Sequence, residues 1–191
     1  MGSFEGTGQI FLGGKRLVFG ATNIDRTFSG VISDLGGDSI AVGGALTKVG
    51  SGTLTLSGAN SFSGGMIING GTIITSHSSA LGNGISTLNA GAILDPVTAL
   101  HTGGLAWNGG RIKLAPAAGE IISLSGALTN GGAGGVYDID FHNLVQTTYT
   151  LTNFANSNFT ASQFSAVIDN PNPNVVYQQQ ILLNPNSVQL A

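Results

Sequence analysis

The chain of 191 residues has no cysteine and few charged residues, and each shortage excludes a class of protein. Without cysteine there is no disulfide framework and no thiolate metal site. Charged residues make up 8% of the chain, whereas an average soluble protein has about 25%. Six basic and nine acidic residues, with no basic run among them, disfavour charge-driven binding to nucleic acid or to an anionic membrane. No apolar run reaches the roughly 18 residues of a transmembrane helix.

Glycine, by contrast, is abundant. It supplies 31 residues, more than twice the usual share of about 7%, and serine, threonine and asparagine are also frequent. These residues are poor helix formers, so a helical bundle is excluded. A hydrophobic content of 41% excludes a disordered chain. The composition therefore predicts an all-β protein with many short strands joined by tight turns.

A short pattern, apolar–Asn–(Gly/Ala)–Gly–x–Ile, occurs three times, around Asn69, Asn89 and Asn108, at nearly equal intervals. A meander of hairpins has no reason to repeat one turn in this way, whereas a solenoid repeats each corner once per coil, here about every 20 residues. Alternating runs such as Thr53–Leu56 indicate strands with one buried face. We expect a right-handed parallel β-helix, because connections between parallel strands are usually right-handed.

The same pattern predicts the corners of the coils. Asparagine tolerates the left-handed backbone conformation, and its amide can bond to its own copy in the next coil. Glycine carries no Cβ and accepts a positive φ. We expect the corners to be formed by Asn69, Gly71, Asn89, Gly91, Asn108 and Gly110, with the three asparagines stacked about 5 Å apart.

The composition changes sharply near residue 136. All glycines lie at or before Gly135, and the part of the chain that follows holds seven of the thirteen aromatic residues. We expect residues 4–136 to form the solenoid body, and residues 137–191 to form C-terminal coils or a cap that buries Phe154 and Phe164. Deleting this tail should cause aggregation or a large loss of stability. Residues 1–3 are interpreted as the remnant of an expression tag.

Residues 48–73, KVGSGTLTLSGANSFSGGMIINGGTI, resemble the autotransporter-associated β-strand repeat, also called the passenger-associated transport repeat. The family pattern is approximately K-x-G-x-G-T-L-x-L-S-G-x-N-x-Y-x-G-G-T-x-x-x-x-G-T-L. The sequence departs from it at Phe62, where tyrosine is usual, at Met66, where threonine is usual, and at Ile73, where leucine is usual.

This resemblance implies part of a β-helical passenger that is exported to the surface of a Gram-negative-type bacterium. The repeat is associated with passenger folding and secretion, so we expect a structural module that acts as a rigid spacer. The implied partner is the passenger's own translocator, a C-terminal membrane β-barrel, which we do not expect within this chain. An adhesin module that binds a host-cell or matrix glycan or protein is the alternative.

Few residues are candidates for catalysis. Arg111-Ile112-Lys113 coincides with the R-I-K triplet of polygalacturonases, but the N-T-D, D-D and G-H-G partners of that family do not occur. Asp138 and Asp140, with His142 beyond them, share one face of a strand and could suit calcium or a glycosidase pair, although a solvent-facing strand is favoured.

We therefore expect no enzyme activity, no metal site and no cofactor. Combined replacement of Arg111, Lys113, Asp138 and Asp140 by alanine should leave the fold nearly intact. Asp95 is predicted to lie one coil away from the Arg111–Lys113 strand. His77 and His101 are interpreted as exposed loop residues. The larger aromatic residues are expected to fill the core or cap, with a carbohydrate-stacking platform as the alternative: Trp107, Phe141, Tyr149, Phe154, Phe159, Phe164 and Tyr177.

Overall fold

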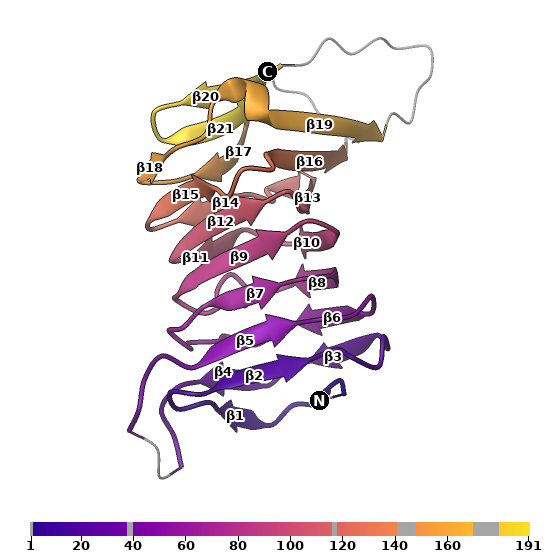
Figure 1. Cartoon of the computed structure of the whole chain (residues 1–191), viewed down its shortest axis with the longest axis vertical. Helices are drawn as coiled ribbons and strands as arrows, with labels where there is room; N and C mark the ends of the chain where they lie inside the picture. The colour runs from indigo at the N-terminus through magenta and orange to yellow at the C-terminus, as the bar shows by residue number, and fades with distance from the viewer. Residues whose placement is uncertain (1, 38–39, 116–117, 141–147, 170–179) are drawn as a thin grey trace.

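The structure is a computed structural model that describes residues 2–37, 40–115, 118–140, 148–169 and 180–191. Short strands stack coil upon coil into a column, with the N-terminus at one end and the C-terminus at the other (Figure 1). The column has three sides, which we call the first, second and third walls in the order in which each coil visits them. Within the described residues, no helix has the length and apolar character needed to cross a membrane.

The first and second walls are parallel sheets of seven strands each. The first wall consists of β2 (Arg16–Phe19), β5 (Ala45–Lys48), β7 (Met66–Ile68), β9 (Ile85–Asn89), β12 (Gly104–Asn108), β15 (Ala127–Asn130) and β18 (Asn156–Ser157). The second wall consists of β3 (Arg26–Phe28), β6 (Thr53–Leu56), β8 (Gly71–Thr75), β10 (Ala92–Pro96), β13 (Arg111–Leu114), β16 (Gly135–Asp140) and β19 (Phe164–Asp169).

The third wall is less regular. It begins with the parallel pair β1 (Gln9–Phe11) and β4 (Val31–Ser33), and continues after two coils of irregular backbone. Its upper part contains β11 (Leu100–Thr102), β14 (Ile122–Leu124), β17 (Tyr149–Asn153), β21 (Ser187–Leu190) and β20 (Ile181–Asn184). One short 3-10 helix, η2 (Ala161–Gln163), precedes β19.

The register shows that the coils differ in length. In the first wall Leu46 pairs with Met66, whereas Leu17 pairs with Leu46, which is a wider interval along the chain. Coils of about 20 residues, a usual length for a solenoid repeat, therefore lie in the middle of the column, and a longer coil precedes them. The prediction of an all-β chain wound into a parallel β-helix is confirmed.

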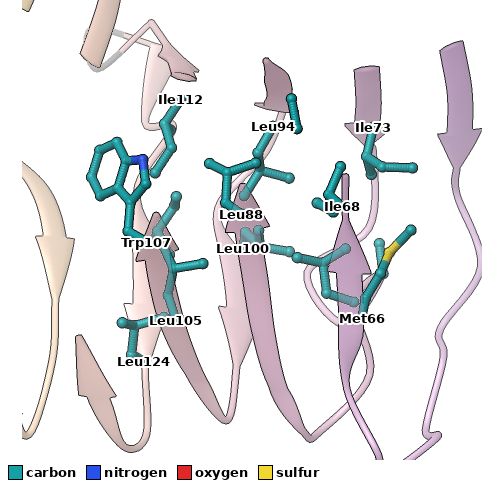
Figure 2. Packing of buried hydrophobic residues seen from close by; sticks show 14 of the residues in the cluster. Met66, Ile68, Ile73, Leu88, Leu94, Leu100, Leu105, Trp107, Ile112 and Leu124 are labelled. Atoms are coloured by element: carbon teal, nitrogen blue, oxygen red, sulfur yellow. The ribbon is translucent and has the colours of Figure 1, made fainter. Parts of the chain in front are cut away.

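The core runs along the inside of the column. In the second wall Leu54, Ile73, Leu94, Ile112 and Tyr137 follow one another in register, and all are buried. Side chains from the facing walls meet them in the interior (Figure 2). Because strand side chains alternate between faces, most of the short strands supply one or two buried apolar groups, which stabilise the fold by about 1.5–3 kcal/mol each.

The C-terminal end is closed by a hairpin. Strand β21 pairs antiparallel with both β17 and β20, and so ends the parallel stacking of the third wall. The predicted boundary at residue 136 falls inside β16, which pairs in parallel with β13 and β19. The change of composition therefore does not coincide with a change of architecture, since parallel coils continue to β19.

Candidate functional site

A ladder of asparagine side chains links three successive coils. Asn89 Nδ2 donates to Asn69 Oδ1 at 2.7 Å, and Asn108 Nδ2 donates to Asn89 Oδ1 at 2.9 Å. Each asparagine lies where a first-wall strand ends, so the ladder follows one corner of the column. The sequence pattern placed these three residues at equivalent corners, and here each amide bonds to the next.

The glycines that follow the asparagines differ between copies. Gly71 and Gly91 have positive φ angles of 64° and 82°. In the third copy the positive φ of 89° falls on Gly109 and not on Gly110. Gly110 has another reason to be glycine, since a Cβ there would collide with Leu88 in the coil below.

We expect Asn89→Ala to lower the free energy of unfolding by about 1–3 kcal/mol, because it removes two amide hydrogen bonds of about 0.5–1.5 kcal/mol each. Asn69→Ala removes only one of these bonds and is the matched control, with an expected loss about half as large. Urea denaturation of both variants measures the difference. Equal losses in the two variants would show that the ladder does not act as a chain of bonds.

Lys48, at the end of β5, is a buried cation that closes the same corner from the inside. Only 2% of the surface of this residue is exposed. Lys48 Nζ donates to the carbonyl oxygens of Val49 at 3.0 Å and Gly50 at 3.1 Å, and to that of Gly70 in the next coil at 3.3 Å. Burial lowers the pKa of Lys48 below its ordinary value of 10.5, and the Asp25 carboxylate partly opposes this shift.

Lys48→Met should lower the free energy of unfolding by about 1–3 kcal/mol at neutral pH, because buried carbonyls lose their donor. Since the folded-state pKa is lowered, the unfolded chain binds more protons below pH 10.5, and wild-type stability rises with pH in that window. The gap between wild type and variant should therefore widen from neutral pH towards 10.5. Thermal melts of both proteins across this range test the sign, and a gap that narrows with pH would contradict it.

Asn60, which lies on the third wall, joins three coils. The side chain is buried, and its Oδ1 accepts a hydrogen bond from the Ile32 backbone N–H at 2.8 Å. Its Nδ2 donates to the Ala80 carbonyl at 2.7 Å. Ile32 belongs to the coil before and Ala80 to the coil after, so one side chain fixes the spacing of both neighbours.

Asp34 makes a related contact at the start of the connection between β4 and β5. Asp34 Oδ2 accepts hydrogen bonds from Ser63 Oγ at 2.6 Å, from the Ser63 N–H at 3.1 Å and from the Gly43 N–H at 3.1 Å. The carboxylate thereby holds both ends of the loop between residues 34 and 43 against the coil above.

Four charged side chains form a row on the outer face of the second wall, which we call the charged row: Asp95, Arg111, Lys113 and Asp138. Arg111 Nη2 lies 3.1 Å from Asp138 Oδ2, and Lys113 Nζ lies 3.9 Å from Asp95 Oδ2. Burial raises the pKa of Asp95, Lys113 opposes this rise, and Asp138 adds to it. Acidic and basic side chains thus alternate from strand to strand on this face, and Asp95 lies beside Lys113 as the coil spacing predicts. Among the described residues no three His, Asp or Glu side chains gather as a metal site would require.

We expect Arg111→Ala and Lys113→Ala each to change the free energy of unfolding by about 0–1 kcal/mol, the usual value of partly exposed ion pairs. Chemical denaturation at low and high salt checks this, because screening should erase the small difference. A loss well above that range, or one insensitive to salt, would mean that the charged row contributes substantially to stability.

The remaining candidates are dispersed. His77 Nδ1 accepts a hydrogen bond from the Ser79 N–H, and His101 is exposed on β11. The backbone of Asp140 lies in β16, but its side chain is outside the described part of the chain, as are Phe141, His142 and Tyr177.

The candidates for a stacking platform that the structure describes, Trp107, Tyr149, Phe154, Phe159 and Phe164, are gathered towards the C-terminal end. Trp107 is fully buried, and its ring meets Tyr137 edge-on at 4.9 Å. Phe159 and Phe164 stack at 4.6 Å beside it. Phe154 and Tyr149 are also buried. These rings fill the interior of the last coils, so none of those described forms an exposed stacking platform.

Sequence reasoning missed Lys48, Asn60 and Asp34 as residues that join coils. A buried polar side chain needs hydrogen-bond partners, but nothing in the residues around these three marks them as buried. The partners lie in neighbouring coils and follow only from the register.

A scan against protein-family models matches residues 46–74 to the passenger-associated transport repeat. The matched segment runs from β5 to β8 and contains both Lys48 and Asn60. The resemblance seen in residues 48–73 is thereby confirmed. A search of curated proteins finds no relative that matches the chain.

Proposed function

Because residues 46–74 are a passenger-associated transport repeat, we propose that this chain is a non-catalytic β-helix module of a secreted bacterial autotransporter passenger. Repeats of this family belong to proteins that are secreted or exposed at the cell surface. The module supports folding of the passenger during export and acts as a rigid spacer. Its partner during export is the passenger's own translocator, a membrane β-barrel.

One observation carries this proposal: the matched repeat bonds to the coil before it and to the coil after it. Asn60 reaches Ile32 and Ala80, which both lie outside the repeat, and Lys48 joins two coils within the repeat through the Gly70 carbonyl. Such a segment sets the register in which neighbouring coils stack. Register must be specified strongly in a parallel sheet, because a slip of one residue turns every buried side chain outward.

The order of folding follows from the direction of export. Coils near the C-terminus leave the translocator first and form around the hairpin β20–β21, and each later coil pairs with the open edge of the one already formed. Burial of apolar surface, at about 25 cal/mol per Å², favours the folded coils outside and opposes their return.

A display experiment separates this role from general stability. The chain is joined to an autotransporter translocator, and the amount on the bacterial surface is compared for wild type, Asn60→Ala and Leu105→Ala. Leu105 is a buried core residue outside the repeat, and its variant serves as a control once its thermal stability is shown to match. Asn60→Ala should reduce display several-fold more than the control. Equal display of the two variants would refute a specific role for the repeat in export.

A further inference from the structure

A hollow of about 320 Å³ lies on the third wall, where β11 and β14 pair. It spans three successive coils. Its lining consists of Ser79, Asn83, His101, Thr102, Gly103, Ser123, Leu124 and Ser125.

Four polar side chains in this hollow have unused hydrogen-bonding capacity. Within the described part of the chain, the side chains of Ser79, Asn83, His101 and Ser123 make no hydrogen bond. Ser79 and Ser123 are partly exposed, and both residues line the hollow. Partly buried hydroxyls without protein partners bond to water or to a ligand.

A larger hollow of about 730 Å³ on the second wall offers a contrast. Its charged groups already have partners: Arg26 Nε lies 3.3 Å from Glu5 Oε2, and Asp25 Oδ1 accepts a hydrogen bond from the Thr53 N–H at 2.6 Å. Of these two hollows, the smaller one is lined by uncharged residues alone.

The chemistry of the lining limits the ligand. No Asp, Glu, Lys or Arg is present, so nothing in the lining would pair with a charged group. Leu124 and Thr102 are buried, so the accessible part of the lining is polar and uncharged. An uncharged ligand rich in hydroxyls fits this arrangement, and that is the chemistry of a neutral sugar.

The pairing of the strands shows along which axis a bound chain would run. His101 pairs with Ser123, and Ser123 pairs with Asn153, so three polar side chains follow the long axis on successive strands. Strands in a sheet lie about 4.8 Å apart, close to the rise of one hexose along an extended glycan. We propose that this hollow binds a neutral glycan chain along the axis of the column, with His101 and Ser123 as its central hydrogen-bonding residues. This inference does not depend on the proposed export role.

Titration of the ¹⁵N-labelled full chain with trisaccharides, followed by NMR, tests the site. The neutral probes are maltotriose, cellotriose and xylotriose, and trigalacturonate is the anionic probe. At least one neutral probe should shift the amide signals of residues 79–83, 101–103 and 123–125. The double variant His101→Ala/Ser123→Ala should bind about tenfold more weakly, since it loses two hydrogen bonds between neutral groups. Thr55→Ala, in the larger hollow, is the control and should bind like wild type.

Three results would overturn the proposal. The first is the absence of any shift at millimolar concentrations of all three neutral probes. The second is equal binding of trigalacturonate, and the third is equal weakening in the Thr55→Ala control. Should the double variant lose its fold, the position of the shifts on the wild-type chain decides the outcome.

Discussion

Replacing Asn60 by alanine is expected to lower the free energy of unfolding by about 2–4 kcal/mol. The Ile32 N–H and the Ala80 carbonyl both lose their partner, and each unsatisfied buried group costs about 1–3 kcal/mol. For a chain of this size, each kcal/mol shifts the melting temperature by about 2–4 °C. Equilibrium unfolding in urea gives the free energy, and a thermal melt gives the shift.

Two further variants sharpen this test. Asn60→Asp keeps an acceptor for the Ile32 N–H but places a carboxylate oxygen against the Ala80 carbonyl, so we expect it to be at least as unstable as the alanine variant. Asn83→Ala removes an exposed asparagine whose side chain makes no hydrogen bond among the described residues, and its stability should equal that of wild type. An Asn60→Ala protein as stable as Asn83→Ala would contradict the role assigned to the buried amide.

Removal of residues 180–191 should cause the larger loss. This deletion takes away Val188 and Leu190, both buried, which together stabilise the chain by about 3–6 kcal/mol. It also uncovers β17, whose paired edge becomes open to other chains. We expect a lower melting temperature and a shift towards aggregates in size-exclusion chromatography.

A full-length variant separates the two causes. Val188→Ser together with Leu190→Ser removes the apolar contacts but leaves β21 in place over β17. This variant should lose stability and stay monomeric, whereas the truncated chain should also aggregate. A truncated chain that is soluble, monomeric and as heat-stable as wild type would exclude the hairpin as a cap.

The sequence predicted the parts of the fold that recur at a fixed interval. Asn69, Asn89 and Asn108 stand at the same corner of successive coils, and their even spacing alone indicated a solenoid. Asp95 was placed beside Lys113 by the same reasoning. Near the N-terminus the interval between paired residues widens, as from Leu17 to Leu46, and there the period is not visible.

Features that depend on contacts between coils could not be predicted from the sequence. Nothing local to Lys48 or Asn60 shows that these polar side chains are buried, because their partners lie in other coils, far away along the chain. The positive φ at Gly109 in place of Gly110 is a similar case, since the constraint on Gly110 comes from Leu88 in another coil.

The closing hairpin did have a local signal. The apolar run of residues 181–183 and the alternating run Ser187–Leu190 lie on either side of Pro185-Asn186, the two residues between β20 and β21. A two-residue connection of turn-forming residues is typical of a hairpin. The change of composition at residue 136 falls within β16, and the chain after it forms further parallel coils and the closing hairpin.

The direction of the backbone hydrogen bonds between stacked strands has a mechanical consequence. The two ends of the chain lie at opposite ends of the column (Figure 1), and the bonds between strands point along the same axis. Tension between the ends therefore opens a terminal coil one bond after another, instead of shearing a whole sheet at once. Such a column yields at low force by unwinding from its ends, and each released coil lengthens the molecule by its own contour, which is greater for the long coils near the two ends than for those in the middle.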